Sequence, residues 1–209
     1  MSEEKYLLQT CNHCGNKGLM EIKGSSNKIY EDYDDMGNPI GLSEEQTWYL
    51  LSCPVCHMAT LCERETQSWD PSIDSITLLY PENLVDTLNV PSDIKGAFDS
   101  AMRTKGIDSA ICLLSLRRTL EMICKKEGAT GGSLEDKIKT LVSDKKLPPM
   151  LDDICYITRK AGNDGAHGDQ IKLSSSDTEQ VIRYVATIIN YLYSMPKRIE
   201  ILKNTIDKK

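Results

Sequence analysis

The chain has 209 residues, of which 40% are hydrophobic and 27% are charged. This composition is typical of a globular protein and excludes a disordered chain. No stretch reaches the roughly 18 consecutive apolar residues that a membrane-spanning helix needs. The first residues are acidic and lack the apolar segment of a secretory signal, so we expect a cytoplasmic protein.

The formal net charge of −6 is unevenly distributed along the chain. Residues 1–92 carry 5 basic and 15 acidic side chains, whereas residues 93–209 carry 20 basic and 16 acidic ones. The two parts therefore have net charges of −10 and +4. Such a break indicates two modules with different partners. A nucleic-acid backbone is a poor partner for the acidic module, while the second module leaves RNA contact open.

Two Cys-x-x-Cys pairs stand in the first third of the chain. Their members are Cys11, Cys14, Cys53 and Cys56. In a reducing compartment, such clustered cysteines indicate metal ligands rather than disulfides. Two pairs supply the four thiolates that a structural zinc ion prefers, with no open position, so the sequence predicts one structural zinc per chain. The alternatives are a redox-active pair, buried thiols without a ligand role, or substitution by His13, His57 or Cys62.

The predicted zinc module is a β-rich ribbon over residues 1–66. The expected strands cover residues 17–23, 28–33, 47–51 and 58–63. A turn is expected at residues 24–27, and the acidic residues 31–45 are expected to form a solvated loop. Residues 67–92 contain three prolines and are predicted to be an extended linker.

From Ser92 onward the apolar residues follow helical spacing, so residues 93–209 are predicted to form a domain of about five or six helices. The expected helices run over 93–105, 108–127, 134–141 and from Pro149 to about Gly162, then from Asp177 through Leu192, with a last one after Pro196. Expected N-caps are Ser92, Asp108, Ser133 and Ser176, the last two opening capping boxes. Cys112, Cys124 and Cys155 are expected core residues.

Three segments of the helical part carry a family resemblance. They are Ser115–Cys124, Ser133–Ile138 and Ile157–Gly168. In this order and spacing they resemble domain-of-unknown-function family 4145, an all-helical group of the HEPN superfamily, over roughly residues 93–198. The resemblance implies an all-α, HEPN-like helical bundle. With the small β-rich zinc ribbon predicted in front of it, the expected fold class is α+β. The resemblance also implies a homodimer through the helical domain and a bacterial or phage setting, in defence or counter-defence.

The resemblance also implies candidate catalytic residues. Active members of the superfamily bring together an arginine, the polar residue after it and a histidine, and cut RNA without metal. The polar residue corresponds to Asn163 and the histidine to His167. Gly162 occupies the usual arginine position, which leaves Arg159 as the nearest candidate. A histidine supplies acid–base chemistry near neutral pH, and an arginine stabilises the charge on the phosphorane.

A structural interpretation competes with this one. Asn163 then caps a helix end, and His167 hydrogen-bonds between helices. Arg117 and Lys160 are candidate RNA contacts, and Arg118 could equally hold phosphate. One of the two arginines can instead pair with Glu121, which lies four residues after Arg117 and three after Arg118. The leading prediction is therefore a zinc-containing RNA- or protein-binding module. The alternatives are a metal-independent endoribonuclease and a dimerising scaffold protein.

Overall fold

The computed structural model describes residues 4–151 and 174–208. The chain divides into two compact units, Met1–Glu82 and Asn83–Lys209, each with its own hydrophobic core. Unit 1 carries 5 basic and 14 acidic residues, and unit 2 carries 20 basic and 17 acidic ones. Among the described residues, no helix is both long enough and apolar enough to cross a membrane.

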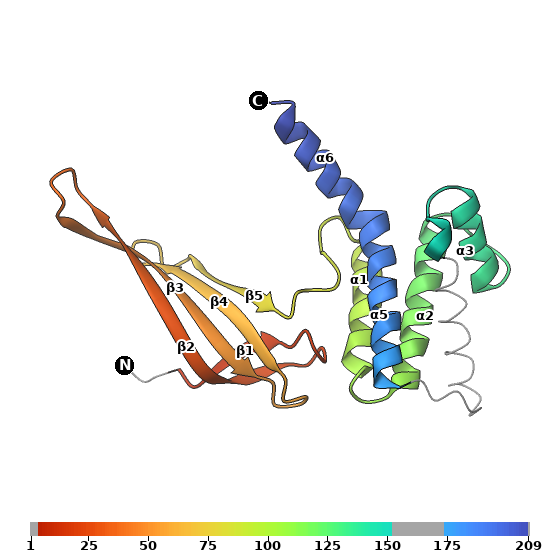
Figure 1. The fold of residues 1–209 in the computed structure, drawn as a ribbon, viewed down its shortest axis with the longest axis horizontal. Helices are drawn as coiled ribbons and strands as arrows, with labels where there is room; N and C mark the ends of the chain where they lie inside the picture. The colour runs from red at the N-terminus through yellow and green to blue at the C-terminus, as the bar shows by residue number, and fades with distance from the viewer. Residues whose placement is uncertain (1–3, 152–173, 209) are drawn as a thin grey trace. The chain divides into compact units, whose positions relative to one another are not determined.

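Unit 1 is a curled antiparallel sheet of five strands, in which each strand pairs with the next one along the chain (Figure 1). The strands are β1 (Tyr6–Thr10), β2 (Lys17–Tyr33), β3 (Pro39–Ser52), β4 (Ala59–Gln67) and β5 (Asp74–Tyr80). A small core on one face is formed by Leu7, Met20, Leu51 and Cys62, together with buried cysteines of the two pairs. The prediction that the first module is rich in β-strands is therefore confirmed.

Strand β2 is longer than the sequence predicts. It runs without a break through residues 24–27, where a turn is predicted, and residues 24–27 pair with Thr47–Leu50 of β3. The predicted turn is therefore wrong, because pairing with this β-branched and aromatic segment overrides the local turn preference. Strand β3 likewise begins at Pro39, inside the stretch predicted to be a loop.

The turn that joins β2 to β3 lies at residues 34–38, and hydrogen bonds to Asp34 stabilise it. The Asp34 carboxylate accepts hydrogen bonds from the backbone N–H groups of Met36 and Asn38, at 2.9 and 2.8 Å. Gly37 takes a φ of +79°, which a glycine adopts without steric cost. The acidic segment is thus a two-stranded β-hairpin with a tight tip instead of a solvated loop.

Strand β5 lies within the range 67–92 that is predicted to be a linker. It pairs with β4, and the Arg64 guanidinium binds the Asp74 carboxylate through two contacts of 2.8 and 2.7 Å. Ile76 and Leu78 alternate along β5 and pack against the core of unit 1. The segment is therefore a strand of the sheet, and unit 1 extends to Glu82.

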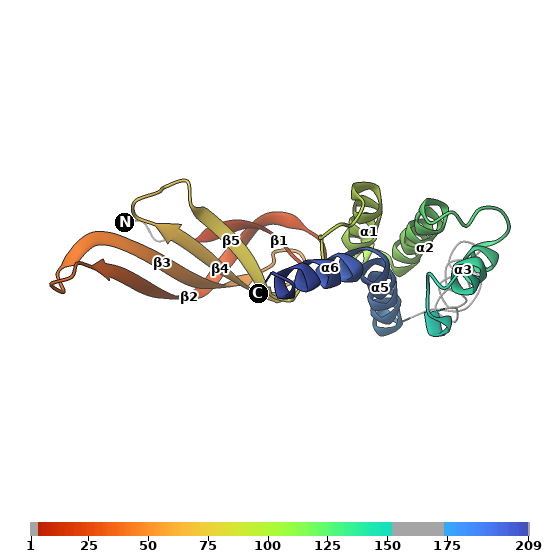
Figure 2. The same cartoon turned by 90° about the horizontal axis from the view of Figure 1, so that it is seen from above.

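Unit 2 is helical throughout its described part. Its elements are α1 (Ser92–Thr104), α2 (Ser109–Lys126), α3 (Leu134–Ser143), the short 3-10 helix η1 (Pro149–Leu151), α5 (Ser175–Ile189), the π-helical turn η2 (Asn190–Ser194) and α6 (Met195–Ile206). Helices α1, α2 and α5 lie side by side, and α3 packs on α2 (Figures 1 and 2). The helices predicted at 93–105 and 108–127 are confirmed. The one predicted from Pro149 begins as η1, and its remainder lies outside the described residues.

The helix caps agree with the sequence in part. Asp108 accepts hydrogen bonds from two backbone N–H groups of the first turn of α2, and Ser133 opens α3 with a capping box to Asp136. The predictions at Ser92 and Ser176 are wrong. Ser92 is the first helical residue, after Pro91. The second capping box starts two residues early, at Ser174, because Asp177 completes it there.

Helix α5 continues through η2 into α6, so Pro196 does not separate two helices. Proline lacks an N–H and clashes with the carbonyl four residues earlier, which a regular helix cannot accommodate. The chain widens just before Pro196, where the Met195 N–H bonds to the carbonyl of Asn190, five residues back. Pro196 then occupies the first turn of α6, where a missing N–H costs little.

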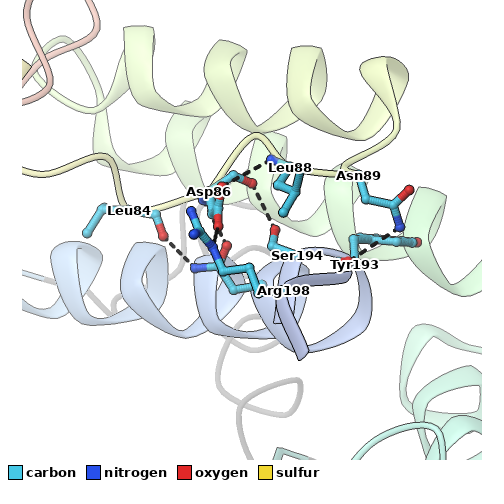
Figure 3. A network of polar contacts seen from close by, with 8 residues as sticks. Leu84, Asp86, Leu88, Asn89, Tyr193, Ser194 and Arg198 are labelled. Carbon is cyan, nitrogen blue, oxygen red and sulfur yellow. Dashed lines mark hydrogen bonds and ion pairs between the residues drawn. The ribbon is translucent and has the colours of Figure 1, made fainter. Parts of the chain in front are cut away.

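A polar network holds the segment before α1 against this π-helical turn (Figure 3). The Asn190 amide donates to the carbonyl of Leu84 at 2.7 Å and accepts from the N–H of Asp86 at 2.9 Å. The Ser194 hydroxyl donates to the carbonyl of Asp86 at 2.9 Å, and Arg198 forms an ion pair with the Asp86 carboxylate. Polar groups of η2 are therefore hydrogen-bonded to residues 84–86, which lie more than 100 positions earlier in the chain.

Candidate metal centre

The four cysteines of the two pairs converge at one end of the sheet. Cys11 and Cys14 lie in the turn between β1 and β2, and Cys53 and Cys56 lie in the turn between β3 and β4. In a sheet whose strands run alternately up and down, the first and third turns lie at the same end. The four sulfur atoms all lie within 4.8 Å of one another.

Contacts between the sulfurs run across the two pairs. The Sγ atoms of Cys11 and Cys56 are 3.7 Å apart, as are those of Cys14 and Cys53. Each pair thus faces the other, so that one ion placed among the four atoms would contact both turns. Three of the four cysteines are buried, and Cys56 is half-buried.

Both cysteine turns have the same backbone conformation. In each, the residue four positions after the first cysteine donates its N–H to that cysteine's carbonyl: Gly15 to Cys11 at 2.7 Å, and His57 to Cys53 at 3.0 Å. Gly15 and His57 both take the left-handed conformation, with φ values of 72° and 58°. Two turns of one geometry present their thiols from opposite sides of a common centre.

Burial and backbone N–H groups shift the pKa values of these thiols in opposite directions. Burial raises the pKa of Cys11 and of Cys14 above the ordinary thiol value. Burial also acts to raise the pKa of Cys53, but hydrogen bonds from the backbone N–H groups of Cys56 and Val55 outweigh it and lower that pKa. Such N–H groups stabilise thiolate charge, which a metal-bound sulfur carries.

The donor set suits zinc. Four sulfur donors, drawn from two Cys-x-x-Cys turns and closed off from solvent on most sides, match the tetrahedral thiolate coordination of structural zinc. These four residues could therefore hold one metal ion. No position in a four-cysteine set is open for a substrate, so the chemistry that it offers is structural.

The substitute ligands considered from the sequence are not part of this cluster. The His13 Nε2 atom lies 2.9 Å from the carbonyl oxygen of Ala59, and the His57 side chain is exposed. Cys62 is fully buried on β4, where burial raises the pKa of its thiol. Cys62 is therefore a core residue of the sheet.

Unit 2 contains a pocket of about 340 Å³ beside α2 and α3. It is lined by Arg118, Glu121, Met122, Lys125, Ala129, Thr130, Gly131 and Lys137. Its lining thus combines three cations and one carboxylate with the apolar side chains of Met122 and Ala129. The sequence leaves open which of Arg117 and Arg118 could contact phosphate, and Arg118 is the one that lines this pocket. Arg118, Met122 and Lys125 follow one helix face at intervals of four and three residues.

Arg117, the predicted RNA contact, does not line this pocket. Its Nε atom lies 3.4 Å from the Glu121 carboxylate, the pair that the alternative interpretation expects. The other candidates, Arg159, Lys160, Asn163 and His167, lie outside the described residues. Their proximity to one another stays a prediction.

A cysteine-cluster sheet followed by a helical unit defines an α+β protein of two modules with a candidate metal centre in the first. The second module identifies the family. Residues 99–208 match the family described as Domain of unknown function (DUF4145), which covers more than half of the chain, and the chain belongs to that family. This confirms the resemblance to family 4145 over residues 99–208. Neither a curated protein nor a solved structure matches the chain.

Proposed function

We propose that this protein is a zinc-stabilised binding module. Zn²⁺ would be held by Cys11, Cys14, Cys53 and Cys56, and one observation carries this assignment: four sulfurs from two separate turns lie within 4.8 Å of one another. A bound zinc ion supplies a cross-link between the two turns. The core of unit 1 is small, so such a cross-link would contribute much of its folding free energy.

The helical unit, on this proposal, has a HEPN-like architecture and binds RNA. Support comes from the pocket beside α2 and α3, whose lining holds the three cations of Arg118, Lys125 and Lys137 against the single carboxylate of Glu121, together with apolar side chains. Phosphate oxygens suit such cations, and apolar side chains suit an unstacked base. Within residues 4–151 and 174–208, these three cations form no ion pair. The basic charge of unit 2 favours the same partner.

Retention of a fluorescein-labelled RNA oligonucleotide by the zinc-loaded full chain tests the RNA proposal. We expect binding that weakens steeply with salt and falls about tenfold in a Lys125→Glu/Lys137→Glu variant, because each reversal removes an attractive charge and adds a repulsive one. A Lys28→Glu/Lys23→Glu variant on unit 1 makes the same change in net charge and should retain binding. Equal losses in both variants, or no salt-sensitive binding, would contradict RNA recognition by this pocket and favour a protein partner.

A second candidate function is a metal-independent endoribonuclease. It is supported by the family match, which spans both Asn163 and His167. Cleavage of transfer RNA that persists in EDTA and disappears in His167→Ala would support it. Arg159→Ala should then reduce the rate as well, because Gly162 leaves no arginine at the usual position. Binding without cleavage leaves the binding module in place.

A further inference from the structure

Strand β2 has a partner strand on both sides only near its start. β1 pairs with residues 17–21 of β2, and one further bond joins the Ile22 N–H to the carbonyl of Lys5 at 3.0 Å. Beyond Ile22, β3 is the only strand beside β2 within the described residues. Figures 1 and 2 show this part of the β2–β3 hairpin extending past the rest of the sheet. We call residues 23–45 the hairpin arm.

The two edges of the hairpin arm differ. On the β3 side, the Ser68 N–H donates to the carbonyl of Ser43 at 2.9 Å, and β4 pairs with β3 from the next residue onward. On the β2 side, register shifts interrupt the ladder with β3 before Gly24 and after Glu31, and residues 24–31 lie between them. Backbone groups of an antiparallel strand point alternately to its two neighbours, so this segment presents N–H and C=O groups that no described strand pairs with.

Large apolar side chains of the hairpin arm lie in solvent along this edge. Every residue from 23 to 41 is exposed, and Ile29, Tyr30 and Tyr33 are 55%, 42% and 57% exposed. Because side chains alternate along a strand, Ile29 and Tyr30 lie on opposite faces of the arm. A strand added beside β2 would therefore find an apolar contact on each of its faces.

The charge of the hairpin arm identifies the kind of strand that suits it. The arm carries two lysines and six carboxylates, a net charge of −4. Lys23 binds Glu21 at 2.7 Å, and the Lys28 ammonium lies 4.3 Å from the centre of the Tyr30 ring. In the part of the chain that the structure describes, none of the six carboxylates forms an ion pair: Glu31, Asp32, Asp34, Asp35, Glu44 and Glu45. Such a field attracts cations and repels phosphate.

We propose that residues 24–31 of β2 bind an extended, lysine- or arginine-rich segment of another protein as an additional β-strand. The backbone of β2 supplies the hydrogen bonds, Ile29 and Tyr30 contact apolar side chains of the segment, and Glu31 and Asp32 pair with its cations. The arm of a second copy suits this edge less well, because it carries the same net charge of −4. The site lies in unit 1 and does not rest on RNA binding by unit 2.

Fluorescence anisotropy of a labelled (Lys-Val)₄ peptide with the zinc-loaded full chain tests the proposal. We expect saturable binding that weakens with salt, and no binding of (Glu-Val)₄. The matched control is a chain of N-substituted glycines with the same lysine and valine side chains. It keeps the charges but lacks every backbone N–H, so it should bind at least about tenfold more weakly. Equal binding of the two, or no saturable binding of (Lys-Val)₄, overturns the proposal.

Two double variants locate the site. Glu31→Gln/Asp32→Asn should weaken (Lys-Val)₄ binding about three- to tenfold, because both charges that face the added strand are lost. Glu63→Gln/Glu65→Gln changes the net charge equally on β4, which has strands on both sides, and should stay within about twofold of the parent chain. Equal losses in the two variants would mean that the overall charge of unit 1 attracts the peptide, which overturns the proposal.

Hydrogen exchange gives a readout of strand pairing that charge alone would not change. We expect (Lys-Val)₄ to increase the protection of residues 24–33, because added hydrogen bonds slow exchange of the edge N–H groups. Protection gained only in other parts of the chain overturns the proposal. Protection of residues 24–33 that rises with protein concentration in the absence of peptide, together with a dimer in sedimentation equilibrium, assigns the edge to a second copy and overturns it as well.

Discussion

At the scale of single residues, the four cysteines of the candidate metal centre differ from the other buried thiols in having one another as neighbours. We expect Cys53→Ser to reduce bound zinc from about one ion per chain to near zero, because a hydroxyl is a poor substitute for one thiolate of four. Cys62→Ser, an equally buried change on β4, should retain the metal. Elemental analysis of both purified variants checks this. Equal zinc loss in the two would mean that Cys62 or general unfolding controls the site.

Asn190 is the residue on which the polar network of unit 2 most depends. In Asn190→Leu, the Asp86 N–H and the Leu84 carbonyl lose their partners, and we expect a loss of about 1–3 kcal/mol in the free energy of unfolding. Arg198→Ala removes an ion pair whose arginine is 66% exposed, so it should cost less than about 1 kcal/mol. Urea unfolding at one fixed protein concentration compares them. A larger loss for Arg198→Ala would contradict this assignment.

The sequence predicts some of these residues better than others. The cysteine cluster could be predicted because the two residues between the cysteines of each pair let both sulfurs face one ion. Asn190 could not, because its partners lie 104 and 106 residues earlier in the chain. Arg117 and Arg118 are adjacent, and only the positions of Glu121 and the pocket distinguish them.

At the scale of elements, strand β2 passes from a buried base to an exposed tip. Met20, near its start, is fully buried, whereas Met36, in the turn after it, is 89% exposed. We expect Met20→Ala to cost about 2–5 kcal/mol of stability and Met36→Ala to change it by less than about 0.5 kcal/mol. Thermal unfolding of the zinc-loaded variants measures both. A marked loss in Met36→Ala would show that the hairpin tip is packed against something in the folded protein.

The helices were more predictable than the strands, for a physical reason. Helix signals are local: Asp108 and Ser133 act on N–H groups two or three residues away, so their caps can be read from the chain. The extent of β2 depends on β3, whose partner residues stand more than 20 positions later for much of the ladder. Gly24 and Ser25 look like turn residues until that pairing is known.

At the scale of the whole molecule, two separate cores imply two separable stabilities. Removing the metal with a chelator should unfold unit 1, whose small core includes the cysteines, and leave the core of α1, α2, α3 and α5 intact. Hydrogen exchange resolved by peptide mass spectrometry should show loss of protection in β1–β4 and unchanged protection in α2 and α5. Loss of protection throughout the chain would mean that the units depend on each other for folding.

The charge asymmetry of the chain can be assigned to its two units. With β5 included in the sheet, unit 1 has a net charge of −9 and unit 2 a net charge of +3. The division was predictable from composition, but its position at Glu82 was not, because β5 resembles a linker until its pairing with β4 is known. The proposed function depends on this combination of a basic helical unit and an acidic sheet with a candidate metal centre.

X-ray absorption at the zinc edge of the purified full chain tests the metal centre most directly. We expect about one zinc per chain with four sulfur neighbours at about 2.3 Å and no oxygen or nitrogen in the first coordination sphere. Mixed sulfur and nitrogen coordination would place a histidine among the ligands. A purified protein without zinc, in which all four thiols react with a thiol reagent, would contradict the proposal that these cysteines bind zinc.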